Sequence, residues 1–235
     1  MTVQNGPEDI FFNLTDGDDT ALLSDTGRYD PTLLASLSGG IRALAGNDQV
    51  IGSSRNDLVY GNAGDDILRG FAGDDTLWGG VGSDYIVGDG QVNAGPGNDN
   101  LNGNRGNDLV TGGPGNDLVR GGQDQDSLTG DEGDDTLIGD FGQDTLLGGA
   151  GSDLFVLRRD TAVAPDANGS LAVDLILDFN PTEDVIGLTG GLPSEALQFV
   201  PVSFGTTTAT AINFVDNDGV LKLSLIHSSE PTRPY

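Results

Sequence analysis

An aspartate recurs every nine residues through the middle of the chain, and this spacing constrains the fold more than any other feature. One series runs from Asp48 to Asp84, and after a single interval of fifteen residues a second runs from Asp99 to Asp153. The twelve aspartates are Asp48, Asp57, Asp66, Asp75, Asp84, Asp99, Asp108, Asp117, Asp126, Asp135, Asp144 and Asp153. A fixed short period indicates a repeat architecture, in which each unit contacts chiefly its neighbours.

Each aspartate is the sixth place of a nine-residue unit, and the other places are also patterned. The eighth place is apolar in all twelve units: Val50, Val59, Leu68, Leu77, Ile86, Leu101, Val110, Val119, Leu128, Leu137, Leu146 and Phe155. Glycine fills the first place in ten units, with Ala43 and Ala94 as exceptions, and the fourth place in ten, with Arg55 and Asp124 as exceptions. Twelve units in one register make the pattern specific. A disordered linker of similar composition would not keep apolar residues in register.

The pattern predicts an all-β fold, a parallel β-roll of about six coils. Six residues rich in glycine, asparagine and aspartate favour a turn, and the three that follow favour a short strand with one side chain facing inward. Two turns and two strands then close one coil in eighteen residues. Stacked coils would align the eighth-place residues into a thin continuous core.

The same stacking would align the aspartates into two rows, one along each edge of the roll. Carboxylates about 5 Å apart repel each other strongly unless a cation lies between them. Calcium prefers six to eight oxygen ligands, which carboxylates and turn carbonyls can provide. We therefore expect a hard divalent cation between adjacent turns, ligated by carboxylates and backbone carbonyls.

The array resembles the RTX (repeats in toxin) calcium-binding β-roll, the haemolysin-type calcium-binding repeat. The resemblance rests on the GGxGxDxUx pattern from Ala43 to Val156. It implies Ca²⁺ held by sixth-place aspartates of neighbouring coils together with main-chain oxygens, and export by a type I secretion system. Pairing each unit with the second one along gives eight ions, or ten if the ladder continues past the six extra residues within Gly88–Ala94. We expect Arg55 to weaken or empty the sites that it borders.

Composition narrows the class of partner. The chain has 37 acidic and 10 basic residues, a formal net charge of −27, and no cysteine. Such a charge disfavours nucleic acid and anionic membranes as partners, and the lack of thiols excludes disulfides and thiolate zinc sites. Residues 1–14 show no cleavable signal peptide, and no apolar stretch reaches the roughly 18 residues of a membrane span.

The sequence divides into four segments. Residues 1–42 are predicted to form an N-terminal cap that includes a degenerate turn at Thr15–Thr20, and residues 43–157 the roll with a bulge near 88–94. Residues 158–222 are predicted to form a β-rich cap. This cap contains the DxIxDF segment from Asp174 and a hairpin, Ala209–Val215 with Val220–Leu225. We expect the aspartates of the DxIxDF segment to stabilise turns of the cap rather than to bind a further ion. Residues 223–235 resemble a translated sequencing adapter, so we expect a non-native tail and build nothing on His227.

Two functional hypotheses follow from these features. The first is a secreted, extracellular calcium-binding protein that is not an enzyme, folds when Ca²⁺ fills its turns, and has an unknown protein target. The second is a fragment of a larger RTX enzyme, adhesin or surface-layer protein. The sequence has no HExxH, GxSxG or P-loop motif. The adjacent aspartate pairs recur with the repeat, which favours ion binding over paired-carboxylate catalysis.

Overall fold

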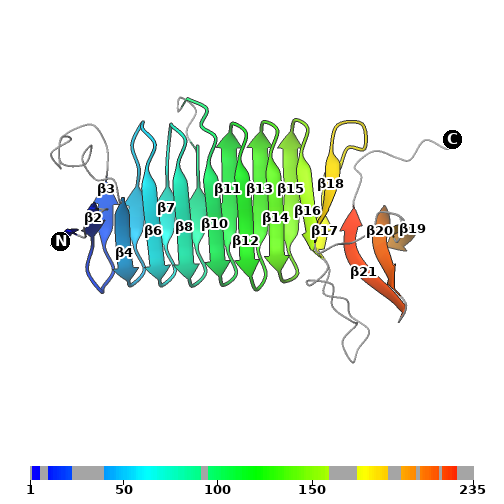
Figure 1. Cartoon of the computed structure of the whole chain (residues 1–235), viewed down its shortest axis with the longest axis horizontal. Helices are drawn as coiled ribbons and strands as arrows, with labels where there is room; N and C mark the ends of the chain where they lie inside the picture. The colour runs from blue at the N-terminus through cyan, green and yellow to red at the C-terminus, as the bar shows by residue number, and fades with distance from the viewer. Residues whose placement is uncertain are drawn as a thin grey trace.

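The structure is a computed structural model that describes residues 2–5, 10–22, 40–90, 95–158, 174–189, 197–204, 207–216 and 219–226. Within these residues the regular elements are β-strands stacked side by side along the long axis of the molecule (Figure 1). They form two sheets, one of ten strands and one of eleven. The predicted parallel β-roll is confirmed.

The first sheet contains the even-numbered strands from β2 to β18 and, at its end, β1. Its strands, in spatial order, are β1 (Thr2–Asn5), β2 (Ile10–Asn13), β4 (Ile41–Ala45), β6 (Leu58–Ala63), β8 (Thr76–Val81), β10 (Asn100–Arg105), β12 (Leu118–Gln123), β14 (Thr136–Phe141), β16 (Leu154–Arg158) and β18 (Val185–Thr189). All neighbours pair in parallel except β1 and β2, which are antiparallel.

The second sheet contains the odd-numbered strands from β3 to β21 together with β20, and it ends in an antiparallel extension. In spatial order its strands are β3 (Thr20–Leu22), β5 (Gln49–Ile51), β7 (Ile67–Arg69), β9 (Tyr85–Val87), β11 (Leu109–Pro114), β13 (Ser127–Glu132), β15 (Thr145–Ala150), β17 (Asp174–Ile176), β21 (Gly219–Ile226), β20 (Thr207–Asp216) and β19 (Leu197–Phe204). The pairs from β3 to β21 are parallel, and β21–β20 and β20–β19 are antiparallel.

The register of the sheets places one repeat unit over the second one along. Val119 lies opposite Leu137 in the first sheet, and Val110 opposite Leu128 in the second, each pair eighteen residues apart. The same register continues across the six-residue insertion within Gly88–Ala94, because Leu77 pairs with Leu101 and Ile86 pairs with Val110. The ladder therefore continues past the insertion, whose residues 91–94 lie outside the described part.

The eighth-place side chains form the core between the two sheets. All twelve are at most 1 % exposed. Ala21, Ile41 and Ala43 extend this core at one end, and Leu157 and Ile176 extend it at the other. Each coil buries few apolar side chains of its own. Its stability therefore comes from packing against the neighbouring coils, as in other repeat proteins.

Several strands are longer than the three residues expected from the pattern. β8 covers six residues and continues through the third place of the next unit, Val81. The second and third places still pair with the next coil, as Asn62 with Gly80 and Ala63 with Val81, although the second place takes a positive φ, 124° at Gly80. The turn proper is therefore shorter than the glycine-rich stretch.

Both ends of the array continue the stack. β2 and β3 pair in parallel with β4 and β5, so the degenerate turn at Thr15–Thr20 belongs to an additional coil. Residues 23–39, which include part of the predicted cap, lie outside the described residues. At the other end β17 and β18 extend the two sheets, and β20 and β21 form the predicted hairpin. Leu223–Ile226, part of the predicted tail, lie in β21, and residues 227–235 are outside the description.

In the part of the chain that the structure describes, no helix is long and apolar enough to cross a membrane.

Candidate metal centre

The sixth-place aspartates form two ladders, each held by one carboxylate oxygen. The backbone N–H of each aspartate donates to Oδ1 of the aspartate one coil further on, as from Asp66 to Asp84 and from Asp99 to Asp117, both at 2.8 Å. The same bond crosses the insertion, from Asp75 to Asp99, at 2.8 Å. Ten such pairs link the twelve aspartates of the array. Each carboxylate is therefore fixed in orientation.

The second carboxylate oxygen, Oδ2, is buried and has no hydrogen-bond partner in ten of the twelve aspartates. These are Asp48, Asp66, Asp75, Asp84, Asp99, Asp108, Asp117, Asp126, Asp135 and Asp144. A buried polar atom without a partner costs about 1–3 kcal/mol, and more when it carries charge. Ten repetitions of this cost in one fold indicate that something other than the chain satisfies these oxygens.

Glycine at the first place provides the space that the Oδ2 atoms face. A Cβ at Gly130 would overlap both Oδ2 of Asp135 and the carbonyl oxygen of Gly148 in the next coil. The same overlap occurs at Gly61, with Asp66 and the Gly79 carbonyl. The space is thus lined by carboxylate and carbonyl oxygens, the donor set that Ca²⁺ prefers.

The predicted ion sites between the coils are not clusters of metal-binding side chains alone. Among the described residues, no group of three or more histidine, cysteine, aspartate or glutamate side chains is placed to hold a metal ion. An ion in these turns would be ligated by carboxylates of adjacent coils together with main-chain carbonyls, and the residues present fit a hard cation in that way.

Burial raises the pKa of the ladder carboxyls. Desolvation is the main cause, and nearby aspartates add to it: ladder neighbours at Asp75 and Asp117, and aspartates outside the ladder at Asp99 and Asp108. The pKa is raised to about 8 at Asp75, Asp117 and Asp126, to about 7 at Asp84 and Asp99, and to about 6 at Asp66, Asp108 and Asp135. The pKa of Asp48, Asp144 and Asp153 is also raised.

We expect the apo roll and its ion binding to respond to pH in opposite directions. A carboxyl whose pKa is higher in the folded state binds more protons there, so its contribution to stability is present below the unfolded pKa of 3.8 and lost as pH rises through about 6 to 8. In EDTA, β-structure monitored by circular dichroism should therefore increase on acidification from pH 8 to pH 5. Calcium affinity should fall over the same change, because protons compete with the ion. Calcium titration midpoints equal at pH 6 and pH 8 would contradict this prediction.

A methyl group at a first-place glycine should disrupt the neighbouring site. A Cβ at Gly121 would overlap Oδ2 of Asp126, so we expect Gly121→Ala to displace this carboxylate and to reduce the number of bound calcium ions by one or two. Gly17→Ala is the matched control, because a Cβ there meets nothing within 4 Å. Calcium counts by elemental analysis would test the pair, and equal counts for both variants would contradict the geometry.

The fifth place has its own ladder, which runs in the opposite sense. The side-chain oxygen of Asn116 accepts from the N–H of Asp134 in the next coil at 3.0 Å, and that of Asp65 accepts from Ser83 at 2.8 Å. This bond explains why the fifth place so often carries asparagine or aspartate, whereas Ser83, Gln125 and Ser152 take part through their backbone N–H groups. Both backbone and side chain thus hold the turns in stacked register.

The turn that contains Arg55 is closed by a hydrogen bond within the turn. Oδ2 of Asp57 accepts from the N–H of Ser53 at 2.6 Å and from its hydroxyl at 3.1 Å. By contrast Asp124, the other fourth-place exception, takes a φ of 83° as glycine does elsewhere, and Asp126 keeps its unpartnered Oδ2. The Asp57 oxygen is therefore already satisfied, which supports the expectation that the site bordered by Arg55 is weak.

Closed turns of the same kind occur at both ends of the roll. Oδ2 of Asp19 accepts from the N–H of Thr15, and Oδ2 of Asp184 from the N–H of Asn180, both at 2.7 Å. These turns satisfy the carboxylate without an ion.

Three aspartates outside the predicted set also join the ladders. Asp19 donates its N–H to Asp48 Oδ1 at 2.7 Å, and Asp174 and Asp184 accept from Asp144 and Asp153 at 3.2 and 3.0 Å. Their signal in the sequence is an aspartate two residues before an inward apolar residue. Burial raises the pKa of Asp174, and the nearby Asp144 carboxylate raises it further.

Asp178, in the same DxIxDF segment, has a capping role. Its two carboxylate oxygens accept from the N–H groups of Gly148 at 3.0 Å and Gly149 at 2.8 Å. Asp178 therefore caps two backbone N–H groups of the adjacent coil, whereas Asp174 of the same segment and Asp184 beyond it belong to the ladders.

The insertion changes one assignment made from the sequence. Gly88, rather than Ala94, occupies the first place next to Asp99, since a Cβ at Gly88 would overlap Asp99 Oδ2. The extra residues therefore fall within the turn. They leave Asp89 3 % exposed, with Oδ2 accepting from Gly97 N–H at 2.5 Å and Oδ1 buried without a partner. Its environment could not be predicted because it depends on the insertion.

The fold and the site together define a class, the repeat β-roll proteins that bind metal ions between stacked turns. The family profile described as RTX calcium-binding nonapeptide repeat (4 copies) matches residues 42–70, 51–86, 67–93, 93–128 and 120–155. Residues 42–155 are therefore an array of RTX calcium-binding nonapeptide repeats, which indicates a calcium-binding protein. These repeats are structural calcium-binding units and not catalytic ones. No curated protein matches the chain.

Proposed function

We propose that the protein is a secreted calcium-binding module in which ions between adjacent turns drive folding after export. The observation that carries the proposal is the double row of buried Oδ2 atoms without partners, several of which lie beside a main-chain carbonyl oxygen of the next coil, as at Gly61 and Gly130. The twelve sixth-place aspartates are the proposed ligands, with main-chain carbonyls completing each shell.

Electrostatics favour a requirement for ions. The repeat block, residues 43–157, holds 20 acidic and four basic residues. Ten calcium ions would change the formal charge of the chain from −27 to −7, since each adds two positive charges. Binding thus turns repulsion between neighbouring carboxylates into ligation.

The number of ions tests the proposal. The unbroken ladder has ten aspartate pairs, and the Asp57–Asp75 pair includes the closed turn. We expect nine or ten calcium ions per chain, by elemental analysis after gel filtration in Ca²⁺, and calcium positions beside the Oδ2 atoms in a crystal structure of the loaded protein. A count of one or two ions, or ions located away from these aspartates, would reject the assignment.

Secretion is supported by the calcium concentrations that such sites need. Extracellular modules bind Ca²⁺ with dissociation constants of roughly 10⁻⁴ to 10⁻³ M, far above cytosolic levels. A chain that stays unfolded at low Ca²⁺ is also suited to a type I secretion channel. The alternative, a segment of a larger exported RTX enzyme, adhesin or surface-layer protein, uses the same roll and is distinguished by mapping the surrounding reading frame.

A further inference from the structure

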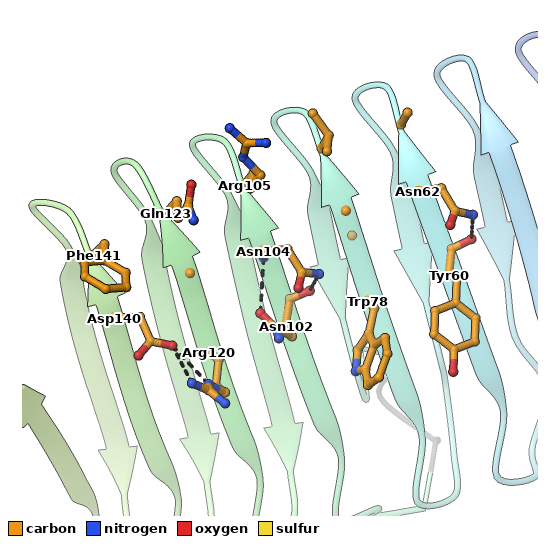
Figure 2. Close-up of a pocket in the computed structure, with 15 residues that line it drawn as sticks. Tyr60, Asn62, Trp78, Asn102, Asn104, Arg105, Arg120, Gln123, Asp140 and Phe141 are labelled. Atoms are coloured by element: carbon orange, nitrogen blue, oxygen red, sulfur yellow. Dashed lines mark hydrogen bonds and ion pairs between the residues drawn. The ribbon is translucent and has the colours of Figure 1, made fainter. Parts of the chain in front are cut away.

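A groove crosses the outer face of the first sheet over β6, β8, β10, β12 and β14 (Figure 2). Its volume is about 610 Å³. One side is a row of ninth-place residues in register across the strands: Tyr60, Trp78, Asn102 and Arg120. The other side is a row of third-place residues that includes Val81, Arg105 and Phe141. Gly80 and Gly122 lie between the rows and lower the floor.

The groove exposes apolar side chains that the roll itself does not need. Trp78 is 39 % exposed, Phe141 45 % and Val81 53 %. The Tyr60 and Trp78 rings lie edge to face with centroids 4.9 Å apart, so that the pair forms a fixed aromatic platform. Outward places do not contribute to the core between the sheets. Clustered exposed aromatic surface indicates a binding site.

The polar groups of the groove are held in place. Oδ2 of Asp140 accepts from Nη2 of Arg120 at 2.6 Å and from Nε at 3.1 Å, and Asp140 is only 8 % exposed. Asn102 and Asn104 are linked by hydrogen bonds of 3.2 and 3.3 Å. Amide and guanidinium groups in fixed positions can both donate to a ligand and, at the amides and the carboxylate, accept from it.

The charges of the groove and of the whole chain disfavour both polyanions and polycations as ligands. The groove carries Arg105 and Arg120 against Asp140, a local formal charge of +1, on a chain whose formal charge is −27 without ions and would still be −7 with ten calcium ions. A polyanion is repelled by the chain as a whole, and a polycation meets two guanidinium groups in the groove. An uncharged ligand with many hydroxyl groups is complementary to these surroundings.

We propose that this groove binds a neutral polysaccharide. A pyranose ring has an apolar C–H face that stacks on an exposed aromatic ring, and hydroxyls at its rim that both donate and accept hydrogen bonds. Trp78 is the proposed stacking platform, and Asn102, Asn104 and the Arg120–Asp140 pair are the proposed hydroxyl partners. Five strands at about 4.8 Å spacing span roughly 19 Å, long enough for a short oligosaccharide segment.

Affinity electrophoresis in native gels with Ca²⁺ tests the proposal. The neutral probes are hydroxyethyl cellulose, galactomannan and arabinoxylan, and carboxymethyl cellulose is the anionic counterpart of the first. We expect at least one neutral polymer to retard the protein, carboxymethyl cellulose to retard it less, and Trp78→Ala to weaken binding about tenfold. Phe141→Ala should weaken it at the other end of the groove. Tyr85→Ala, an aromatic change on the second sheet, is the matched control and should leave retardation unchanged.

Three outcomes overturn the proposal. Retardation by none of the neutral polymers rejects a glycan site, and retardation by carboxymethyl cellulose alone rejects a neutral ligand. An equal loss with Tyr85→Ala rejects the location. Circular dichroism of every variant in the same Ca²⁺ buffer shows whether the roll has folded, so a failure of calcium-driven folding is distinguished from a failure of sugar binding.

Discussion

In EDTA the purified chain is expected to give the far-UV circular dichroism of a largely unfolded polypeptide, and addition of Ca²⁺ is expected to produce a β-sheet spectrum in a cooperative transition. Ordering one residue costs about 1–2 kcal/mol, and burial of one side chain per nine residues offsets little of this. Without ions the fold must also keep ten carboxylate oxygens buried and unpartnered. The expected midpoint lies at roughly 10⁻⁴ to 10⁻³ M Ca²⁺.

Amide hydrogen exchange gives an independent measure of the same transition. We expect the strands of the array to exchange freely in EDTA and to be protected in Ca²⁺. Mg²⁺ at equal concentration is the control, since its smaller, strictly octahedral shell suits these turns poorly. Protected β-structure in EDTA at neutral pH would show that the ion decorates a roll already formed, and calcium-gated folding would then be wrong.

Asp117→Ala is expected to remove about two calcium ions and to shift the folding midpoint to higher Ca²⁺. Asp117 accepts from Asp99 N–H and donates its own N–H to Asp135, so its carboxylate lies between two coil interfaces. Loss of Oδ1 leaves the buried Asp99 N–H without its acceptor, at a cost of about 1–3 kcal/mol, and loss of Oδ2 removes a proposed ligand. Calorimetric calcium titration measures both the stoichiometry and the midpoint.

Two further variants separate the causes. Asp117→Asn keeps an oxygen that can accept from Asp99 N–H and removes the charge, so we expect it to lose ions with a smaller loss of folding stability. Asp16→Ala removes one exposed carboxylate outside both ladders and should change neither quantity. If Asp16→Ala and Asp117→Ala had equal effects, net charge and not the ladder would govern folding.

The sequence by itself determined the coil and its core. The nine-residue period with an apolar eighth place allowed only a fold in which every eighteenth residue stacks, and all twelve predicted core residues are buried. The resemblance to RTX repeats, carried by the same places, is confirmed by the family match over residues 42–155. These features are local and recur in every unit, so the structure predicted for one unit holds for the others.

The tertiary structure alone decided what happens where the repeat is broken. It placed Gly88 beside Asp99 across the insertion and closed the Arg55 turn through Ser53, and neither follows from spacing. It also recruited Asp19, Asp174 and Asp184 into the ladders through bonds that span 29 to 31 residues. The outer groove likewise needs five strands in register, because Trp78 and Phe141 are far apart in sequence. Contacts of this kind depend on how the coils stack. A periodic sequence pattern predicts the stacking only where the nine-residue period is unbroken.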